Sequence, residues 1–470
     1  MGTGASGWIA CTLLKKIKFI KKITIIGSSK IPSIGVGEST TFGFVSHILN
    51  NFELKKFVQE SDAAVKYGVY YKNWSKKDFI HYFRSQEPFF RQKSDEETYG
   101  EMLGNKDSEI HIHDLVGNKL WNFIQKNQVS LNFREHIHSW HFDAGKFIQF
   151  LRSINLQDDK VSLIEDTIID CEFSLKDRIN YIIGESGKKY TADYFVNCCG
   201  DNELNTKIFK EDYISLSPYL LTNKALVYPL KYSNKREQFH PYTVAKTMKN
   251  GWRWITPTQS RIGTGYVFSD SYISVDEATN EFLEDIGDKT IEPLLVNFSP
   301  RRNKTPFKTN SCTIGMSSGF LEPLDAPGLT MTLSAIRTLI EILKYKNNSL
   351  KLMKYSNFLN FLNDVNNDIK IEYEWWCSFI LNQYKTCWRN DTQFWIDHKN
   401  VKCEFYEEIM NSLNDVRMDL YKKHEYMMFY FTTAAKDIQW KSKTKQKPFI
   451  VEELDTETIH HLDYIQQFYE

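Results

Sequence analysis

The sequence lacks an excess of charge of either sign and any long apolar run. Lys and Arg together number 59, as do Asp and Glu, so the 470-residue chain has a formal net charge of zero. A general electrostatic attraction to nucleic acid or to an anionic membrane surface is therefore not expected. No stretch approaches the ~18 apolar residues that a membrane-spanning helix needs. We predict a soluble protein that binds neither nucleic acid nor membrane.

Cysteine motifs are also missing. The 8 cysteines show no C-x-x-C pair and no regular spacing, so neither a secreted disulfide scaffold nor a cysteine zinc site is indicated. The first residues fit an N-myristoylation pattern only loosely. The cationic pair Lys15-Lys16 follows the apolar segment 8–14, whereas a signal peptide carries its positive charge before that segment. We therefore expect reduced thiols and a cytoplasmic location.

The remaining composition is that of a globular protein. Hydrophobic residues make up 41% and charged residues 25% of the chain, values that exclude a disordered chain and a coiled coil. At about 100 to 200 residues per domain, the length predicts two to four domains, or one large fold with insertions. The chain is long enough for an enzyme.

The first residues predict a glycine loop that opens a helix. Gly2, Gly4 and Gly7 form a G-x-G-x-x-G pattern that includes Ala5, and apolar residues at helical spacing follow over 8–17. Glycines let a backbone approach a pyrophosphate, and the N-terminus of the helix supplies unbonded N–H groups. The pattern alone is weak evidence for dinucleotide binding.

A β-branched apolar run at Ile23–Ile26 predicts a buried parallel strand after this helix. The two elements indicate a β-α-β unit, but two features depart from the usual pattern. No strand precedes Gly2, and Gly27 stands where an acid that binds the ribose hydroxyls is usual.

Helix signals occur at three further places. Residues 35–40 read Gly-Val-Gly-Glu-Ser-Thr, and their hydroxyl residues can cap a helix that begins near Thr41, although the segment alone is typical of a capped loop. Asp143 is an expected N-cap for a helix that runs to Leu151. After Gly328 the pattern is helical almost without interruption.

Strand signals fill the middle of the chain. The first predicted strands are 161–164, 167–171, 179–183 and 194–200, the last of them a buried strand that ends at a glycine turn. The further strands 226–230, 242–246, 252–255 and 263–268 predict a mostly antiparallel sheet laid against the first domain. Trp252 and Trp254 lie on one face of a strand that a proline ends, which alone indicates a core strand. Residues 317–328 are rich in turn formers and lead into a long helix that begins near Leu329.

In this order the glycine loop, the 35–40 segment, the Trp-rich strand and the 317–328 segment resemble the flavin-dependent halogenases of the tryptophan-halogenase type. That family shares its fold with the single-component flavin monooxygenases. Further matching segments are 64–74, which contains the family's Lys, and 141–147, 261–267 and 389–395. The resemblance covers residues 2 to about 395.

The resemblance implies an α/β fold: an FAD-binding Rossmann-like three-layer domain with an inserted antiparallel sheet and a helical C-terminal region. It implies a discontinuous FAD-binding and halogenation core over 1–345. The inserted sheet, on the substrate side, is expected at about 205–310, and a mostly helical substrate-side region at 346–470.

The resemblance also implies the cofactors and partners. FAD is expected as exchangeable FADH2, used with O2 and a halide ion on a small aromatic substrate, and reduced by a separate NAD(P)H-dependent flavin reductase. Self-association into a homo-oligomer is left open. The residues implied in cofactor binding are Gly2, Gly4, Ala5, Gly7, Gly35, Gly37, Glu38, Ser39, Thr40, Leu324 and Gly328.

By the same resemblance, Lys66 is the catalytic residue that meets hypohalous acid beside the substrate. An ammonium group can polarise hypohalous acid, a neutral amine can form a haloamine, and burial can lower the pKa of a Lys enough for either. Without the family context, a Lys among apolar residues is more typical of a side chain that extends to solvent. Trp252 and Trp254 are implied to separate flavin from substrate, which protects the oxidant.

The 322–328 segment departs most from the family pattern. The family's carboxylate near the Lys falls on Asp325, one methylene shorter than the usual Glu, and the two halide-binding positions fall on Pro327 and Gly328. Proline has no backbone N–H, so half of the expected anion site is absent unless Ala326 donates in a shifted register. We therefore predict weaker halide binding, or a preference for bromide and iodide over chloride.

Metal binding and other functions are weaker alternatives. The pairs His111/His113 and His136/His138, with His141, could suggest a metal, but no carboxylate or Cys ligand pattern accompanies them, and we predict no metal site. A flavin-dependent aromatic hydroxylase on the same fold is the alternative enzyme. An inactive flavin-binding homologue is the alternative outside enzymes.

Overall fold

The fold is taken from a computed structural model. The structure describes residues 1–30, 38–41, 48, 51, 54–66, 68–76, 78–82, 139–174, 178–201, 203–240, 242–349 and 355–414. Gly35, Gly37 and the helix expected after Thr41 lie outside these residues. Within them no helix is long and apolar enough to cross a membrane.

A parallel layer forms the centre of the first unit. β1 (Ile23–Gly27) pairs in parallel with β7 (Val161–Glu165), and β11 (Phe195–Asn197) pairs in parallel with β19 (Ser311–Thr313). Residues 1–2 lie between the two pairs, because the Met1 amine donates to Val196 O at 2.8 Å and the Gly2 N–H donates to Ile26 O at 2.8 Å. Through these two hydrogen bonds, residues 1–2 are joined to both strand pairs.

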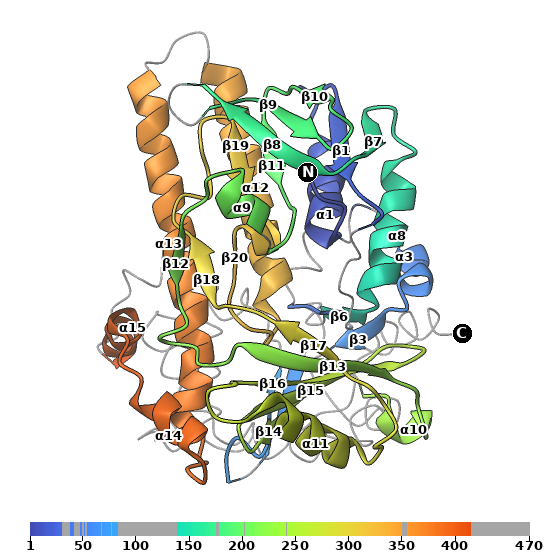
Figure 1. The fold of residues 1–470 in the computed structure, drawn as a ribbon, viewed down its shortest axis with the longest axis vertical. Coiled ribbons are helices and arrows are strands. Elements are labelled where there is room, and N and C mark those ends of the chain that lie inside the picture. The colour runs from blue at the N-terminus through green and yellow to red at the C-terminus, as the bar shows by residue number, and fades with distance from the viewer. Residues whose placement is uncertain are drawn as a thin grey trace, which may run out of the picture.

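Helices and a second sheet cover the two faces of this layer (Figure 1). α1 (Ala5–Leu14) packs against α8 (Ala144–Asn155) and α12 (Pro327–Ser349) on one face. On the other face lie the antiparallel strands β8 (Ile168–Phe173), β9 (Ile179–Gly184) and β10 (Lys189–Tyr190). A separate apolar cluster that includes Ile26, Ile182 and Phe195 joins these two sheets. The Rossmann-like three-layer prediction is confirmed.

A seven-stranded sheet forms the second unit. Its order is β17 (Leu294–Asn297), β13 (Lys224–Leu230), β16 (Ile262–Phe268), β15 (Gly251–Pro257), β14 (Thr243–Met248), β4 (Gly68–Lys72) and β5 (Phe79–Tyr82). Every neighbouring pair is antiparallel except β14–β4. The antiparallel insertion is confirmed, but β4 and β5 come from residues before its expected start. α11 (Val275–Ile286) covers one face.

Small sheets connect the two units. β2 (Glu38–Ser39), β6 (Ser139–Phe142) and β3 (Ala64–Lys66) form a three-stranded sheet in the order β2-β6-β3, beside α3 (Leu54–Glu60). β12 (Tyr213–Ser215), β18 (Arg301–Asn303) and β20 (Gly319–Phe320) form another. The remaining short helices are α9 (Glu203–Lys207), α10 (Lys235–Gln238) and the 3-10 turn η3 (Gly315–Ser317).

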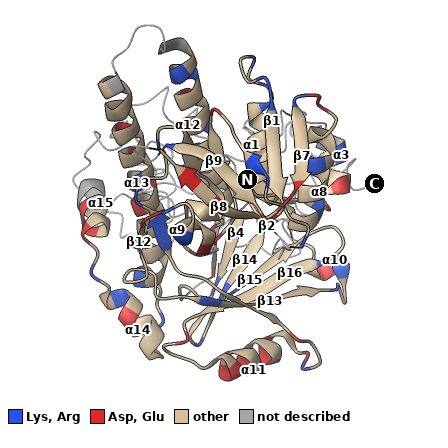
Figure 2. Cartoon of the chain, turned by 45° about the horizontal axis from the view of Figure 1, so that its top comes forward, with Lys and Arg blue, Asp and Glu red and all other residues tan. Residues whose placement is uncertain are grey.

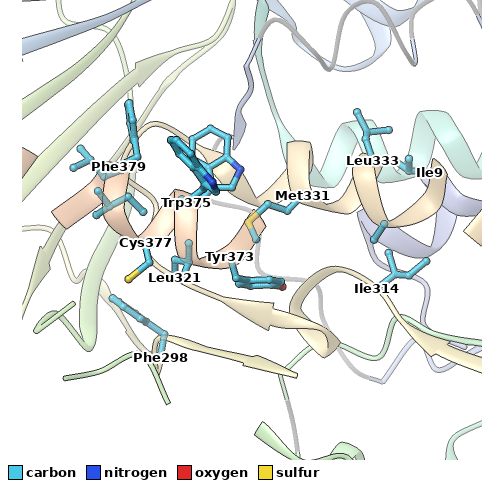
Figure 3. Close-up of a cluster of buried hydrophobic side chains, with 14 of the residues drawn as sticks. Ile9, Phe298, Ile314, Leu321, Met331, Leu333, Tyr373, Trp375, Cys377 and Phe379 are labelled. Carbon is cyan, nitrogen blue, oxygen red and sulfur yellow. The ribbon is translucent and has the colours of Figure 1, made fainter. Parts of the chain in front are cut away.

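The part of the C-terminal region that the structure describes, up to residue 414, is helical, as predicted. α13 (Tyr355–Thr386), α14 (Gln393–Asn400) and α15 (Glu404–Asn414) follow α12. α12 begins at Pro327 rather than near Leu329, because the first helical position needs no N–H and suits proline. Buried side chains of α12 and α13 meet those of the 314–321 segment in an apolar cluster (Figure 3).

Charged residues of both signs are distributed along the chain. Figure 2 shows acidic and basic positions interspersed along the helices, while the strands of the seven-stranded sheet are largely uncharged. This mixed distribution agrees with the zero net charge of the chain.

Candidate active site

Lys66 ends strand β3 and is buried. Its strand pairs with β6, which places Lys66 opposite Ser139, and the residue is only 1% exposed. Its Nζ donates a hydrogen bond to Thr40 O at 2.9 Å. The alternative in which Lys66 extends to solvent is therefore wrong: tertiary packing covers a side chain that local sequence could not place.

The protonated and neutral forms of Lys66 are both populated near neutral pH. Burial lowers the pKa of Lys66 to about 7, and the Asp325 carboxylate acts in the opposite direction. Because an ammonium group loses its hydration on burial, the neutral amine becomes accessible at physiological pH. Both the donor form and the nucleophilic form are thus available at one position.

Asp325 lies in the loop between β20 and α12. It is 7% exposed, and it accepts a hydrogen bond from the phenol of Tyr71, a fully buried residue of β4. Asp325 and Ala326 have φ values of 59° and 55°, in the left-handed region that L-residues seldom adopt. Backbone strain of this kind clusters at functional sites. Leu324, predicted to bind cofactor, is fully buried in the same loop.

The start of α12 differs from a complete anion site. Pro327 supplies no N–H, and the Ala326 N–H donates to Pro323 O at 3.0 Å within the turn. The shifted register, in which Ala326 replaces Pro327 as a donor, is therefore not formed. Gly328 faces open space, with no atom within 4 Å of a Cβ built there. Its N–H belongs to the first helical turn, where no intrahelical acceptor exists.

Ser39, Thr40 and Thr41 connect the elements around Lys66. The Ser39 and Thr243 hydroxyls lie 3.0 Å apart, which joins this segment to β14 of the seven-stranded sheet. The Thr41 and Thr330 hydroxyls lie 2.5 Å apart, which joins it to the first turn of α12. The segment therefore fixes the Lys66 strand relative to the loop that carries Asp325. Of Glu38, the structure describes the backbone as part of β2.

The glycine loop contains both packing glycines and an open one. A Cβ on Gly2, whose φ is +98°, would lie 2.2 Å from Cys198 O, and a Cβ on Gly7 would lie 2.2 Å from Gly2 O. Gly4, the N-cap of α1, has no atom within 4 Å of such a Cβ. The backbone at Gly4 is therefore open at the N-terminus of α1, an arrangement that fits the pyrophosphate of FAD.

Gly27 departs from the dinucleotide pattern for a local reason. A Cβ at this position would lie 2.4 Å from the Thr3 side chain. An acidic side chain cannot fit there while Thr3 packs against β1. The missing ribose carboxylate is thus explained by packing of the glycine loop.

Trp252 and Trp254 lie on the same face of β15 and are both buried. Their ring centroids are 6.2 Å apart, and Trp254 covers Gly265, where a Cβ would lie 2.1 Å from the indole. The Trp252 Nε1–H donates to Glu322 Oε1 at 3.2 Å. In the sequence Glu322 opens the Glu-Pro-Leu part of the 322–328 segment that matches the family, but that match assigned its side chain no role.

His141 is a structural residue. Its Nδ1 lies 3.0 Å from Pro257 O and its Nε2 lies 2.8 Å from the Thr243 hydroxyl. Burial and the nearby Lys66 charge hold the pKa of His141 well below its ordinary value. His111, His113, His136 and His138 lie outside the described residues. Among those described, no group of three or more metal-ligating side chains is found.

Comparisons with known proteins identify the family. The family model for tryptophan halogenase matches residues 1–445. The chain belongs to the tryptophan halogenase family. It is therefore an enzyme of the flavin-dependent halogenase type, and this finding favours halogenation over the alternative of hydroxylation. The sequence-based recognition of the family is confirmed.

Individual relatives agree with this assignment. Tryptophan 7-halogenase RebH of Lentzea aerocolonigenes is 26% identical over 430 residues, which span 86% of this chain and 78% of that protein. The VirX1 apo structure has a TM-score of 0.76 at 23% identity, covering 100% and 97% of the two chains. Tar14, a tryptophan C-6 flavin-dependent halogenase (chlorinase) from taromycin biosynthesis, has a TM-score of 0.74 at 20% identity, covering 100% and 95%. The two structures share the fold of this chain.

Proposed function

We propose that this enzyme halogenates an electron-rich aromatic or heteroaromatic carbon through hypohalous acid and Lys66. When bound, FADH2 supplies the two electrons for the reaction FADH2 + O2 + X⁻ + H⁺ → FAD + HOX + H2O. The substrate then reacts as ArH + HOX → ArX + H2O. The observation that carries the proposal is Lys66, a buried amine whose pKa is about 7 and which lies within electrostatic reach of Asp325.

Lys66 and Asp325 have separate roles in this proposal. In its ammonium form Lys66 donates a hydrogen bond to the oxygen of HOX and makes the halogen more electrophilic; in its neutral form it attacks the halogen and releases water. The negative charge of Asp325 favours the ammonium form. Both residues thus act on the oxidant after it has formed.

Trp252 and Trp254 exclude the substrate from the flavin side. The two indoles are buried on one strand face, with their ring centroids 6.2 Å apart. Direct oxygen transfer from flavin to substrate, which a hydroxylase requires, is then disfavoured. This arrangement supports halogenation as the outcome.

FAD is proposed to bind along the glycine loop and the 35–40 segment, with Gly4 next to its pyrophosphate. We predict that Gly4→Ala weakens FAD binding by about tenfold, because a Cβ would occupy the space that the ligand needs, on the order of one lost charge-assisted hydrogen bond. The melting temperature should stay unchanged, since no protein atom lies within 4 Å of that Cβ. Titration calorimetry and a thermal melt measure the two effects. Gly7→Ala is the matched control, which should instead destabilise the fold. Unchanged FAD affinity in Gly4→Ala would remove Gly4 from the site.

FAD reduction is proposed to require a separate NAD(P)H-dependent reductase, so that FADH2 enters as an exchangeable cosubstrate. The sequence has no second glycine fingerprint for a nicotinamide. We expect NADH alone to leave the flavin absorbance at about 450 nm unchanged, and a trace of any flavin reductase to bleach it anaerobically. Bleaching by NADH without the reductase would contradict this partner assignment. We also propose, from the sequence alone, a cytoplasmic location.

The relatives make tryptophan the first substrate to test. RebH is named as acting on tryptophan, and free tryptophan is electron-rich enough for the chemistry. Mass spectrometry of a panel of tryptophan, indole and phenol compounds, supplied with FADH2, O2 and iodide, identifies the substrate. Halogenation of tryptophan would extend the relatives' activity to this chain. Halogenation of another aromatic compound alone would replace tryptophan as the substrate, and no halogenated product from any aromatic compound would contradict the proposed function.

A further inference from the structure

Glu322 is a fully buried carboxylate at the meeting point of four elements. It lies two residues after β20, in the loop that also presents Asp325, and is 0% exposed. Its Oε2 accepts from the Thr222 hydroxyl at 2.5 Å, and its Oε1 accepts from the Trp252 indole at 3.2 Å. The Tyr384 phenol of α13 donates to both oxygens, at 2.9 and 3.0 Å. Three neutral donors thus satisfy a carboxyl group that no solvent reaches.

The network continues into the C-terminal helices. The Tyr384 ring stacks on His398 of α14 at 4.0 Å between centroids. The Leu221 N–H donates to His398 Nε2 at 3.4 Å, so that Nδ1 carries the proton and donates to Phe394 O at 3.0 Å. Leu221 is followed by Thr222, whose hydroxyl donates to Glu322. The carboxylate therefore holds Trp252, α13 and the Leu221–Thr222 segment in one arrangement.

The three donors do not respond alike to the charge of Glu322. The hydroxyls of Thr222 and Tyr384 can rotate and accept a hydrogen bond from the O–H of a neutral carboxyl group, whereas the Trp252 indole can only donate one. A hydrogen bond to a carboxylate is stronger than one to a neutral carboxyl oxygen. Trp252 is thus the partner whose position depends most on the ionised form.

We propose that Glu322 is the positioning residue for Trp252, and that it sets the share of FADH2 oxidation that ends in halogenated product. The competing path is FADH2 + O2 → FAD + H2O2. An indole that leaves its position opens the partition between the flavin and the substrate, and the oxidant is lost as H2O2. This inference rests on the proposed function, in which Trp252 forms part of that partition.

The titratable neighbours of Glu322 keep the same charge near pH 7, where Glu322 itself titrates. Burial raises the pKa of Glu322 to about 7, while its three donors act in the opposite direction. The titratable groups that face it are Tyr384 and Cys377 of α13, with His398 behind Tyr384. Burial raises the pKa of Tyr384 and Cys377 well above their ordinary values and lowers that of His398 to about 3, so all three are neutral near pH 7. Figure 3 shows Cys377 near Leu321, the neighbour of Glu322.

The test compares Glu322→Gln with Glu322→Met in the full-length enzyme. Halogenated product and H2O2 are measured per FADH2 oxidised, from pH 6 to pH 8.5. Met leaves Trp252 without an acceptor, and the product share should fall about tenfold at every pH. Gln keeps a neutral acceptor, so the share should match wild type within about twofold at pH 6 and fall about threefold or more below it at pH 8.5. Lys66 also titrates in this pH range, but it is present in both the wild type and the Gln variant. Its effect therefore cancels when the two proteins are compared at the same pH.

Two further comparisons decide whether the effect passes through Trp252. The Trp252→Phe variant lacks the indole N–H. Adding Glu322→Met to that variant should lower its product share by less than about twofold. Glu281→Gln, which removes a carboxylate of α11 that accepts from Tyr266, should leave the product share unchanged at all pH values. A Met penalty that persists in full without the Trp252 N–H would overturn the proposal.

The proposal would also be overturned if Glu322→Gln lowered the product share equally at pH 6 and at pH 8.5. This comparison remains measurable if the Glu322→Met variant fails to fold. Absence of halogenated product from the wild-type enzyme would instead mean that the proposed function itself fails.

Discussion

Lys66→Ala is expected to lower halogenated product by about a thousandfold while O2 oxidises FADH2 at the wild-type rate. The size follows from the loss of a group that transfers a proton or halogen in the rate-determining step, which contributes roughly 10² to 10⁴. Flavin oxidation is spared because Lys66 acts after hypohalous acid has formed. Stopped-flow absorbance follows the oxidation, and mass spectrometry of the quenched reaction follows the product.

The pH dependence gives the Lys66 prediction a second measurement. Since the pKa of Lys66 is about 7, the ammonium fraction falls as pH rises through that value. If HOX polarisation limits turnover, the product rate falls above pH 7; if haloamine formation limits it, the rate rises there. Lys72→Ala, at an exposed position of β4, is the matched control and should keep wild-type product formation. More than a few per cent of product from Lys66→Ala would show that Lys66 is only structural.

Wild-type enzyme is expected to use iodide best, then bromide, with chloride poor or inactive. In the proposed halide site, the missing N–H at Pro327 would remove a charge-assisted hydrogen bond worth ~1.5 to 3 kcal/mol, or about one to two powers of ten in affinity. Chloride is the most strongly hydrated of the three and must recover that solvation from the site. The turn leaves no substitute donor in Ala326, whose N–H is bonded to Pro323 O.

Pro327→Ala and Pro327→Ser should therefore raise kcat/KM for chloride by about tenfold or more. Both variants restore the same backbone N–H, and equal gains would assign the effect to that group rather than to the Ser hydroxyl. The first position of α12 accepts either residue, so the helix should form as before. Single-halide turnover and pairwise competition measure the change. Equal kcat/KM values for chloride and iodide in the wild-type enzyme would contradict the proposed role of Pro327 in halide selection.

Local patterns in the sequence predicted most of the secondary structure. The glycine loop and the apolar spacing over 8–17 correspond to α1, and the β-branched run corresponds to β1. The Asp143 cap was also right, since its side chain accepts from the Lys146 N–H at 2.9 Å, although α8 extends to Asn155. These features depend on residues within a few positions of each other, which is why they can be read directly.

Contacts between distant segments could not be predicted in the same way. β4 joins the seven-stranded sheet through β14, a pairing across more than 170 residues that neither strand signals by itself. The Tyr71–Asp325 bond and the Thr222–Glu322 bond join residues 254 and 100 positions apart. Family resemblance supplied a role for Asp325, whereas for Glu322 it supplied only the matching Glu-Pro-Leu segment and no role. The roles of both residues therefore depended on the tertiary fold.

In the proposed reaction, the oxidant made from FADH2 and O2 reaches the substrate as halogen and not as oxygen. The most direct measurement is a high-resolution mass spectrum of the product from the aromatic compound that the panel identifies, formed with FADH2, ¹⁸O2 and iodide. We predict a product in which one hydrogen is replaced by iodine, with no ¹⁸O incorporated, and with none formed by Lys66→Ala. A product that carries ¹⁸O would indicate a hydroxylase, and stoichiometric H2O2 with unchanged aromatic compound would indicate a flavin oxidase without halogenating activity; either result would contradict the account.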